Sequence, residues 1–497
     1  MTTSRIVVAT KPRNHETTKI LAAAAIVAAV AAVSAQQQKP DRAKPPEIGP
    51  APALHLPAIQ KSKLSNGLPV WVVEMHKVPV VQVNLVVFAG TADDPGGRYG
   101  AASLASAMLT NGAGGKSALD IADAVDFLGA DLNAGSAVDS TTVRLHVPVA
   151  RLADALPIMA DVALHPTFQK DELDRLRQQR LTGLIQSRDD PQSIAAAAFP
   201  RVLYGPRHRY GTPAGGTAET IKTFTSDDLR EFYTTTFRPD RATLLAIGDI
   251  TPAAVVPLLE KHFGTWKAPS AAAAKQNIPA VDEPATRTVY VVDKPGAPQS
   301  QVRIGWIGVA RSTPDYFPLT VMNTVLGGSF TSRLNMNLRE KHGYSYGASS
   351  VFDMRLSAGP FASAAGVQTD KTGEALKEFF NELNAIREPV PADELARAKN
   401  YVALRYPGGF ETTGDVSRQL ENALVYHLPD DYFSSYVQKI QAVTAADVRR
   451  VAQKYVQPDR FAVVVVGDLS KIEPQIKALN LGTIKVLTID DVFGPKP

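Results

Sequence analysis

Two stretches of this chain repeat each other at a constant spacing, and this repeat governs its organisation. The tripeptide Pro-Asp-Arg at residues 239–241 recurs at residues 458–460, and an apolar stretch follows each copy. Coincident matches at one offset predict two copies of one domain joined in tandem. Three further matches fall at the same offset of 219 residues: Gly248-Asp249 with Gly467-Asp468, Asp228 and Arg230 with Asp447 and Arg449, and Gln82-Val83 with Gln301-Val302.

Composition marks the boundaries of the two copies. Residues 36–60 are dense in proline and residues 268–286 are rich in alanine and proline, so we expect an extended lead-in and a linker without packed cores. The two homologous domains then occupy residues 61–267 and 287–487. Within each domain, hairpin-like strand pairs mix with helices without strict alternation. This mixture predicts an α+β fold with helices on one face of a mostly antiparallel sheet.

The first 35 residues have the pattern of an export signal. Basic residues precede an apolar run that begins at Ile20, and Val33-Ser34-Ala35 supplies small side chains at a cleavage position. A membrane anchor is the alternative interpretation, but residues 20–32 are shorter than the ~20 residues that a span needs. We therefore expect a signal peptide at residues 1–35, a periplasmic protein and no stable membrane anchor.

Charge and cysteine content exclude two further classes. The net charge is only +4, most of it within the predicted signal peptide, and no basic run remains that would predict a nucleic-acid partner. The chain has no cysteine, which excludes disulfides and thiolate metal sites.

Chemistry-bearing residues are concentrated at residues 326–347, LGGSFTSRLNMNLREKHGYSYG. Leu334 and Leu338, four residues apart, predict a short helix with one buried stripe, and Gly343 is placed to end it before a strand. Arg339 on the last turn and Tyr346 on the strand are then able to converge on one point. A guanidinium and a phenol so placed could both donate hydrogen bonds to a peptide carbonyl. An Arg beside a Tyr, however, is more often explained by surface packing.

The stretch resembles a signature of the pitrilysin or insulinase family, inverted-zincin metallopeptidases that include the mitochondrial processing peptidase: a Gly-rich turn, Ser-Arg-Leu, then Leu-Arg-Glu-Lys-x-Gly-x-x-Tyr. The resemblance implies two homologous α/β-layered halves clasped around a chamber. It also implies that Arg339 and Tyr346 contact the substrate near the scissile bond.

The first half lacks the family's zinc motif, His-x-x-Glu-His on a helix. In the matching segment, residues 98–109, Ser103 and Ala107 stand at the two His positions and Ser106 at the Glu position. The third ligand is expected near Thr182-Gly183, where no Glu stands. Hydroxyl and methyl groups do not suit Zn²⁺, so we expect neither a metal nor another cofactor in this chain.

Other residues offer little replacement chemistry. The nine histidines are well separated in sequence, although a metal site assembled from distant residues stays open. His208 lies in a loop where a structural role is the better interpretation. Ser103 and Ser106 share a helix face, but a serine nucleophile needs a positioned base, and none is assigned.

The resemblance therefore implies a non-zinc-binding subunit of a heterodimeric zinc endopeptidase. Its partner is expected to be a homologous chain that carries the intact motif and the zinc, and its substrate an unfolded peptide that adds along a sheet edge. The alternative is a catalytically inert peptide-binding or scaffold protein. The joint presence of Arg339 and Tyr346 favours the first hypothesis.

Overall fold

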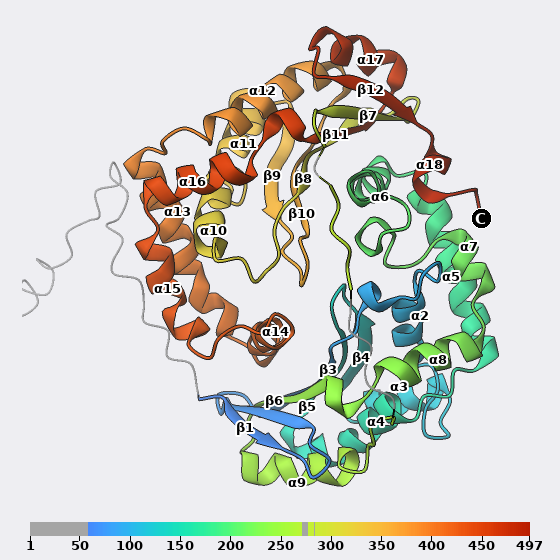
Figure 1. The fold of residues 1–497 in the computed structure, drawn as a ribbon. Helices are drawn as coiled ribbons and strands as arrows, with labels where there is room; N and C mark the ends of the chain where they lie inside the picture. The colour runs from blue at the N-terminus through green and yellow to red at the C-terminus, as the bar shows by residue number, and fades with distance from the viewer. Residues whose placement is uncertain (1–57, 271–276, 283) are drawn as a thin grey trace, which may run out of the picture. The chain divides into compact units, whose positions relative to one another are not determined.

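A computed structural model describes residues 58–270, 277–282 and 284–497 of the chain. The predicted signal peptide, most of the proline-rich lead-in and part of the linker lie outside the described residues. The described residues belong to one compact unit, which contains both predicted domains (Figure 1). Among the residues that the structure describes, no helix has both the length and the apolar character that a membrane span requires.

The N-terminal half is built on a six-stranded sheet of order β1-β2-β6-β3-β5-β4, in which only the β2–β6 pair is parallel. Its strands are β1 (Gln60–Lys63), β2 (Pro69–Glu74), β3 (Val80–Val87), β4 (Asp131–Ser136), β5 (Thr141–Pro148) and β6 (Ala242–Gly248). Its helices are α2 (Ala101–Met108), α3 (Ala118–Phe127), α4 (Leu152–Leu164), α5 (Lys170–Ser187), α6 (Pro191–Tyr204), α7 (Ala218–Thr223), α8 (Ser226–Thr236) and α9 (Pro252–Phe263).

The C-terminal half is built on a second six-stranded sheet, of order β12-β7-β11-β8-β10-β9. Its strands are β7 (Thr288–Asp293), β8 (Gln299–Ile307), β9 (Ser345–Phe352), β10 (Pro360–Gln368), β11 (Ala462–Gly467) and β12 (Thr483–Leu487). Its helices are α10 (Tyr316–Leu326), α11 (Arg333–Asn335), α12 (Thr372–Ala385), α13 (Ala392–Arg405), α14 (Thr413–Val425), α15 (Tyr432–Ala442), α16 (Ala445–Tyr455), α17 (Leu469–Ala478) and α18 (Ile489–Phe493).

The two sheets share one topology. The order β2-β6-β3-β5-β4 of the first sheet corresponds, strand by strand, to β7-β11-β8-β10-β9 of the second. The predicted α+β class, with two homologous halves and mostly antiparallel sheets, is confirmed. Each sheet ends at an edge strand with a single neighbour among the described strands, β4 in the first and β9 in the second.

The repeated Asp residues have a local structural reason. Asp228 and Asp447 are the third residues of α8 and α16, and each closes a capping box at the start of its helix. Their carboxylates accept hydrogen bonds from the backbone N–H and hydroxyl of Thr225 and Thr444, respectively. A capping box satisfies N–H groups that a helix start leaves without partners, so the same sequence begins the same helix in both halves.

One helix of the C-terminal half covers the sheet of the N-terminal half. Leu245 and Ile247 of β6 pack in one core with Leu420 and Leu424 of α14, whereas the alternate residue Leu244 faces the core of its own half. Because successive strand residues point to opposite faces, both faces of this sheet are buried. This explains why β6 is an uninterrupted run of buried residues.

The converse contact is made by the equivalent helix of the N-terminal half. Ile194 and Phe199 of α6 pack against Val464 and Val466 of β11, while Val463 faces the other core. The offset of the repeat relates α6 to α14, so the halves exchange equivalent helices. The sequence predicted helices on one face of each sheet; the structure adds a helix from the other half on the second face.

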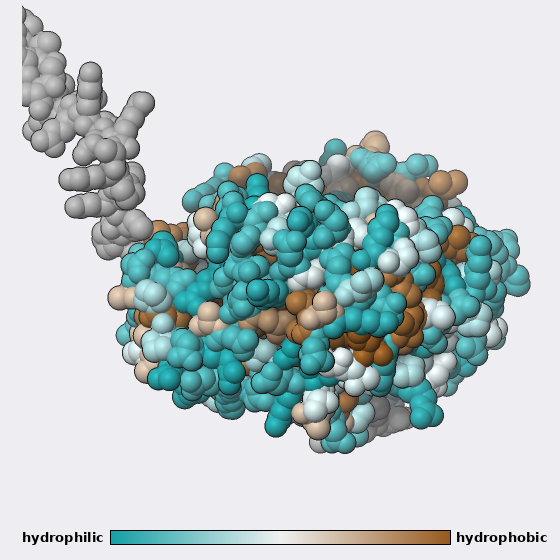
Figure 2. Space-filling model, turned by 90° about the horizontal axis from the view of Figure 1, so that it is seen from above, coloured by the Kyte–Doolittle hydropathy of each residue, from teal (hydrophilic) through white to brown (hydrophobic). Residues whose placement is uncertain are grey.

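Apolar strand surface is thus buried between layers. Figure 2 shows mostly hydrophilic residues on the face seen from above, with hydrophobic ones gathered in a limited area.

Candidate functional site

The short helix predicted around Leu334 and Leu338 forms at residues 333–341, but with mixed geometry. It begins as the single α-turn α11 and continues as a π-helix over Met336–Lys341. Leu334 and Leu338 are both fully buried, as the predicted stripe requires, and Gly343 has a φ of 64° after the helix end. A π-helical turn is rare and is frequently found at functional sites.

Arg339 lies in this π-helical turn and is partly exposed. Its guanidinium stacks over the ring of Phe330 at 4.7 Å, and its Nε lies 3.3 Å from a carboxylate oxygen of Glu340. The side chain is 40% exposed, so the stack fixes its direction while N–H donors stay accessible.

Tyr346 lies in a β-bulge on the edge strand β9. Tyr346 and Gly347 together oppose the single residue Gly366 of β10. The hydroxyl of Ser345 donates to the carbonyl of Gly347 and accepts from its N–H, which holds the bulge in shape. Tyr346 is 89% exposed, and its phenol makes no hydrogen bond to any described residue. Bulges re-aim side chains next to active sites, and this one directs a phenol to solvent.

A buried asparagine connects the elements that carry Arg339 and Tyr346. Asn335 donates through Nδ2 to the carbonyl of Phe330 at 2.7 Å, and its Oδ1 accepts from the N–H of Ala348 at 3.2 Å. The turn beneath Arg339 is therefore tied to the strand of Tyr346. The two side chains do not contact each other in the described part of the chain, and their convergence on one ligand stays a prediction.

Exposed apolar groups are concentrated in the same segment. Phe330, Met336, Tyr346 and Val351 are all among the exposed large hydrophobic residues. Tyr346 and Val351 lie on the edge strand β9, Met336 lies in the π-helical turn, and Phe330 comes shortly before α11.

In the N-terminal half, the helix that would carry zinc is α2. The Ser106 hydroxyl donates to the carbonyl of Ser103 at 3.1 Å, so it is already engaged. Arg180 of α5 donates to the same carbonyl at 2.8 Å and to that of Gly215 at 3.2 Å. A fixed guanidinium beside hydroxyl and methyl groups does not fit a metal ion. No group of three His, Asp or Glu side chains suited to a metal was found in the part of the chain that the structure describes.

A cavity of about 630 Å³ opens beside this helix. Ser103, Arg180 and Gly183 line it, together with Arg209 and with Arg355 from the C-terminal half. These arginines were not identified from the sequence. Arg180 stands two residues before the expected third-ligand position. A basic residue so close to the missing Glu was the one sequence feature that could have indicated a positively charged site here.

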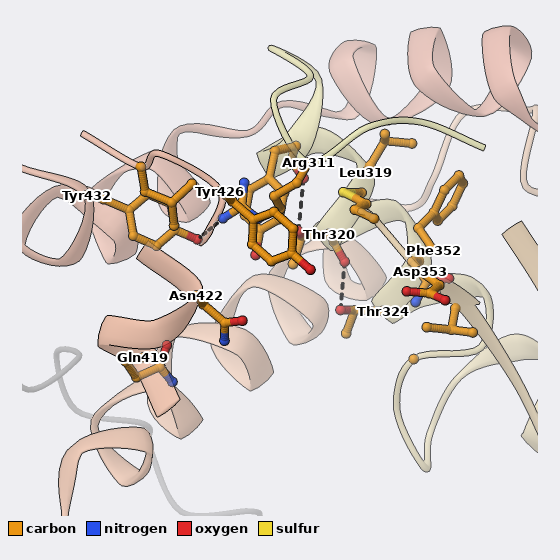
Figure 3. A pocket seen from close by; sticks show the side chains of 16 residues that line it. Arg311, Leu319, Thr320, Thr324, Phe352, Asp353, Gln419, Asn422, Tyr426 and Tyr432 are labelled. Carbon is orange, nitrogen blue, oxygen red and sulfur yellow. Dashed lines mark hydrogen bonds between the residues drawn. The ribbon is translucent and has the colours of Figure 1, made fainter. Parts of the chain in front are cut away.

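A cavity of about 670 Å³ lies at the equivalent place in the C-terminal half, between α10, α14 and the end of β9. Figure 3 shows Thr320 and Thr324 of α10 near Asn422 and Gln419 of α14. Arg311 donates to the hydroxyl of Tyr432 at 2.7 Å, and burial raises the pKa of that phenol. The guanidinium of Arg311 is thus already hydrogen-bonded within the pocket.

His208 has the structural role that its loop suggested. Its Nε2 is 3.0 Å from the carbonyl of Pro279, its Nδ1 accepts from the N–H of Tyr210, and its ring stacks on Tyr204. Both ring nitrogens are therefore used within the fold.

The buried carboxyl of Asp94 should make the free energy of unfolding depend on pH. Burial raises the pKa of its carboxyl to about 6, against the hydrogen bonds it accepts from the N–H groups of Gly100 and Ala102 at the start of α2. The folded state then holds the proton more tightly than the unfolded state, whose pKa is near 3.8. The free energy of unfolding should therefore fall as pH rises from about 4 to about 6, by about 2 to 3 kcal/mol from this group.

Urea unfolding at a series of pH values, for the native protein and Asp94→Asn, measures this contribution. The variant should lack that part of the slope, whereas Asp123→Asn, at an exposed position on α3, should keep it. An unchanged slope in Asp94→Asn would contradict the raised pKa.

Two family models match the chain. Residues 70–203 match the model described as insulinase (peptidase family M16), and residues 223–402 match the model described as the peptidase M16 inactive domain. The chain belongs to the insulinase (M16) family of peptidases. Its sheets, edge strands and α2 are thus those of an M16-like fold.

Known proteins of this family are distant in sequence but similar over most of their length. An uncharacterized zinc protease of Streptomyces coelicolor is 26% identical over 83% of this chain and 90% of its own. A similarly described protein of Mycobacterium bovis is 25% identical over 85% and 96%. The crystal structure of a peptidase M16 inactive domain from Pseudomonas fluorescens has a TM-score of 0.76 and 27% identity, and it covers 82% of this chain and 98% of its own.

Proposed function

We propose that this chain is the non-zinc-binding subunit of a two-chain zinc endopeptidase. One observation carries the proposal: α2 has no zinc-binding side chains at the motif positions, while the edge strand β9 exposes the phenol of Tyr346. Relatives are named zinc proteases, yet here Ser103 and Ala107 stand at the two His positions of the motif, and Arg180 donates to the carbonyl of Ser103. A homologous partner with the intact motif would reconcile the two facts, since it would carry the zinc that this chain does not hold.

The described residues would act on the substrate in two ways. An extended peptide adds to a free sheet edge through main-chain hydrogen bonds, which suits unfolded substrates of varied sequence. Tyr346, exposed on such an edge, donates a hydrogen bond to the oxygen on which charge develops during cleavage. Arg339 holds a neighbouring carbonyl, with its direction fixed by Phe330. The partner supplies the metal and the cleavage itself.

The same proposal includes export to the periplasm and removal of residues 1–35. It rests on the basic and apolar pattern of the first residues.

A mixing experiment tests the proposed function. The purified mature chain is assayed with a quenched fluorescent peptide, alone and with its zinc-motif homologue, and the metal content of each protein is determined. We expect a zinc-free, inactive chain that raises the activity of the homologue. Stoichiometric zinc with activity in the lone chain would overturn the proposal. A chain that binds peptide but never stimulates the homologue would favour the inert binding or scaffold role.

A further inference from the structure

The cavity beside α2 has a positively charged lining. Arg180, Arg209 and Arg355 line it, and no Asp or Glu is among its described lining residues, although the buried Asp94 attracts Arg180 and Arg209 from outside the lining. Arg355 is paired with Asp353 at 2.6 Å. Neither Arg180 nor Arg209 forms an ion pair with a described residue. A cavity lined by arginines and by no acidic residue favours an anionic ligand.

The two unpaired arginines keep hydrogen-bond donors available. Arg180 uses two N–H groups on the carbonyls of Ser103 and Gly215, and burial lowers the pKa of its guanidinium, an effect that a bound anion would offset. Arg209 lies over the ring of Tyr99 at 5.3 Å, and its side chain donates no hydrogen bond to a described residue. Guanidinium groups bind carboxylates through two parallel hydrogen bonds.

The rest of the cavity lining combines apolar side chains with hydroxyl groups, and the cavity is larger than a simple ion needs. Its volume of about 630 Å³ is within the usual range for small-molecule and peptide pockets. An anionic group attached to an apolar body would match such walls. The apolar lining residues include Val138, Leu184, Ile221 and Phe493.

The edge strand β4 leads to this cavity. The hydroxyl of Ser136, the last residue of β4, donates to the carbonyl of Ala102 on α2 at 3.0 Å, and Val138 is part of the cavity wall. A peptide that extends this sheet by one strand would therefore end close to the arginines.

We propose that the cavity binds the C-terminal carboxylate of a peptide, with the last side chain of that peptide against the apolar wall. In this site, arginine side chains supply the positive charge that a metal ion would supply if the motif were intact. The inference deepens the proposed function, on which it rests for the peptide nature of the ligand, because it adds a subsite that recognises a chain end.

Fluorescence anisotropy on the full mature chain alone tests the site. The probes are an N-terminally labelled hexapeptide that ends in Leu with a free carboxylate and the same peptide with a C-terminal amide. We expect the acid to bind about tenfold more tightly than the amide, and more weakly as salt increases. Equal affinity of acid and amide would overturn the proposal.

Variants locate the effect. Arg209→Gln should remove most of the preference for the acid, and it leaves the fold intact because Arg209 donates no side-chain hydrogen bond to a described residue. Arg180→Gln should do the same, although Arg180 also holds two carbonyls. Arg207→Gln is the matched control, since this exposed arginine is not part of the cavity lining and should keep the preference. A preference that persists in Arg209→Gln and Arg180→Gln would contradict the assignment.

Competition distinguishes the source of the carboxylate. Unlabelled hexapeptide acid should displace the probe, whereas hexanoate and inorganic phosphate should require concentrations at least about a hundredfold higher. Hexanoate as effective as the peptide would overturn the peptide assignment. Since the lone chain is used, failure here is separate from a failure to stimulate the zinc-motif homologue.

Discussion

Replacement of Tyr346 by Phe should lower the turnover number of the complex with the zinc-motif homologue by about 10²–10³-fold, the usual cost of one oxyanion donor. The reason is geometric, because the phenol is exposed in a bulge of β9 and has no competing hydrogen bond within the described residues. Phe keeps the ring, so the fold and the affinity between subunits should be unchanged. Single-turnover cleavage of a quenched peptide at saturating subunit concentrations measures the loss.

The control for this variant is Tyr401→Phe, on α13 and outside the segment of Tyr346. It should leave the turnover number within about twofold, as expected for a surface change away from the site. A decrease of less than about threefold for Tyr346→Phe would exclude the catalytic role of the phenol. An equal decrease in both variants would show a general effect of losing a hydroxyl.

Leu245→Ala should destabilise the whole chain by about 2–5 kcal/mol. Leu245 is fully buried between the first sheet and α14 of the other half, so the substitution leaves a cavity in a core that both halves share. Urea unfolding followed by both circular dichroism and tryptophan fluorescence is the measurement. The two probes should report one common transition at a lower midpoint.

Leu119→Ala is the matched control, because Leu119 is 76% exposed on α3. Its effect should stay within about 0.5 kcal/mol. Two separate transitions, with only the N-terminal half affected by Leu245→Ala, would contradict a shared core.

Much of the fold was predictable from the sequence because the signals were local or repeated. The offset of 219 residues aligned β6 with β11 and α8 with α16, and the capping Asp228 and Asp447 marked equivalent helix starts. The hairpin-like strand pairs expected in each domain are represented in the first half by β4 and β5, which pair antiparallel. Alternation and capping depend on neighbouring residues, so a single sequence contains them.

The exchange of α6 and α14 was not predictable in this way. Apolar residues on both sides of β6 indicate that both faces are covered, but they do not say which helix covers the second face. That choice depends on the packing of α14 on β6, two elements that share one core although they are far apart in sequence.

For the candidate site, the sequence indicated which residues matter more accurately than it indicated their geometry. Arg339 was expected on a helix before a strand, and it lies there. The bulge that turns Tyr346 outward depends on Gly366 of a neighbouring strand and was not predicted. The arginines of the cavity come from α5, from the loop after α6 and from the β9–β10 connection, so only the folded chain brings them together.

The exchanged helices also explain why a half without zinc donors would persist. If the N-terminal half were deleted, the face of the second sheet at Val464 and Val466 would lose α6 and be exposed to water, and the first sheet likewise needs α14. The first half is therefore needed for folding whether or not it contributes catalytic residues. The residues beside α2 are not part of that shared packing, so substitutions there are compatible with the fold as long as α6 keeps its place on the second sheet.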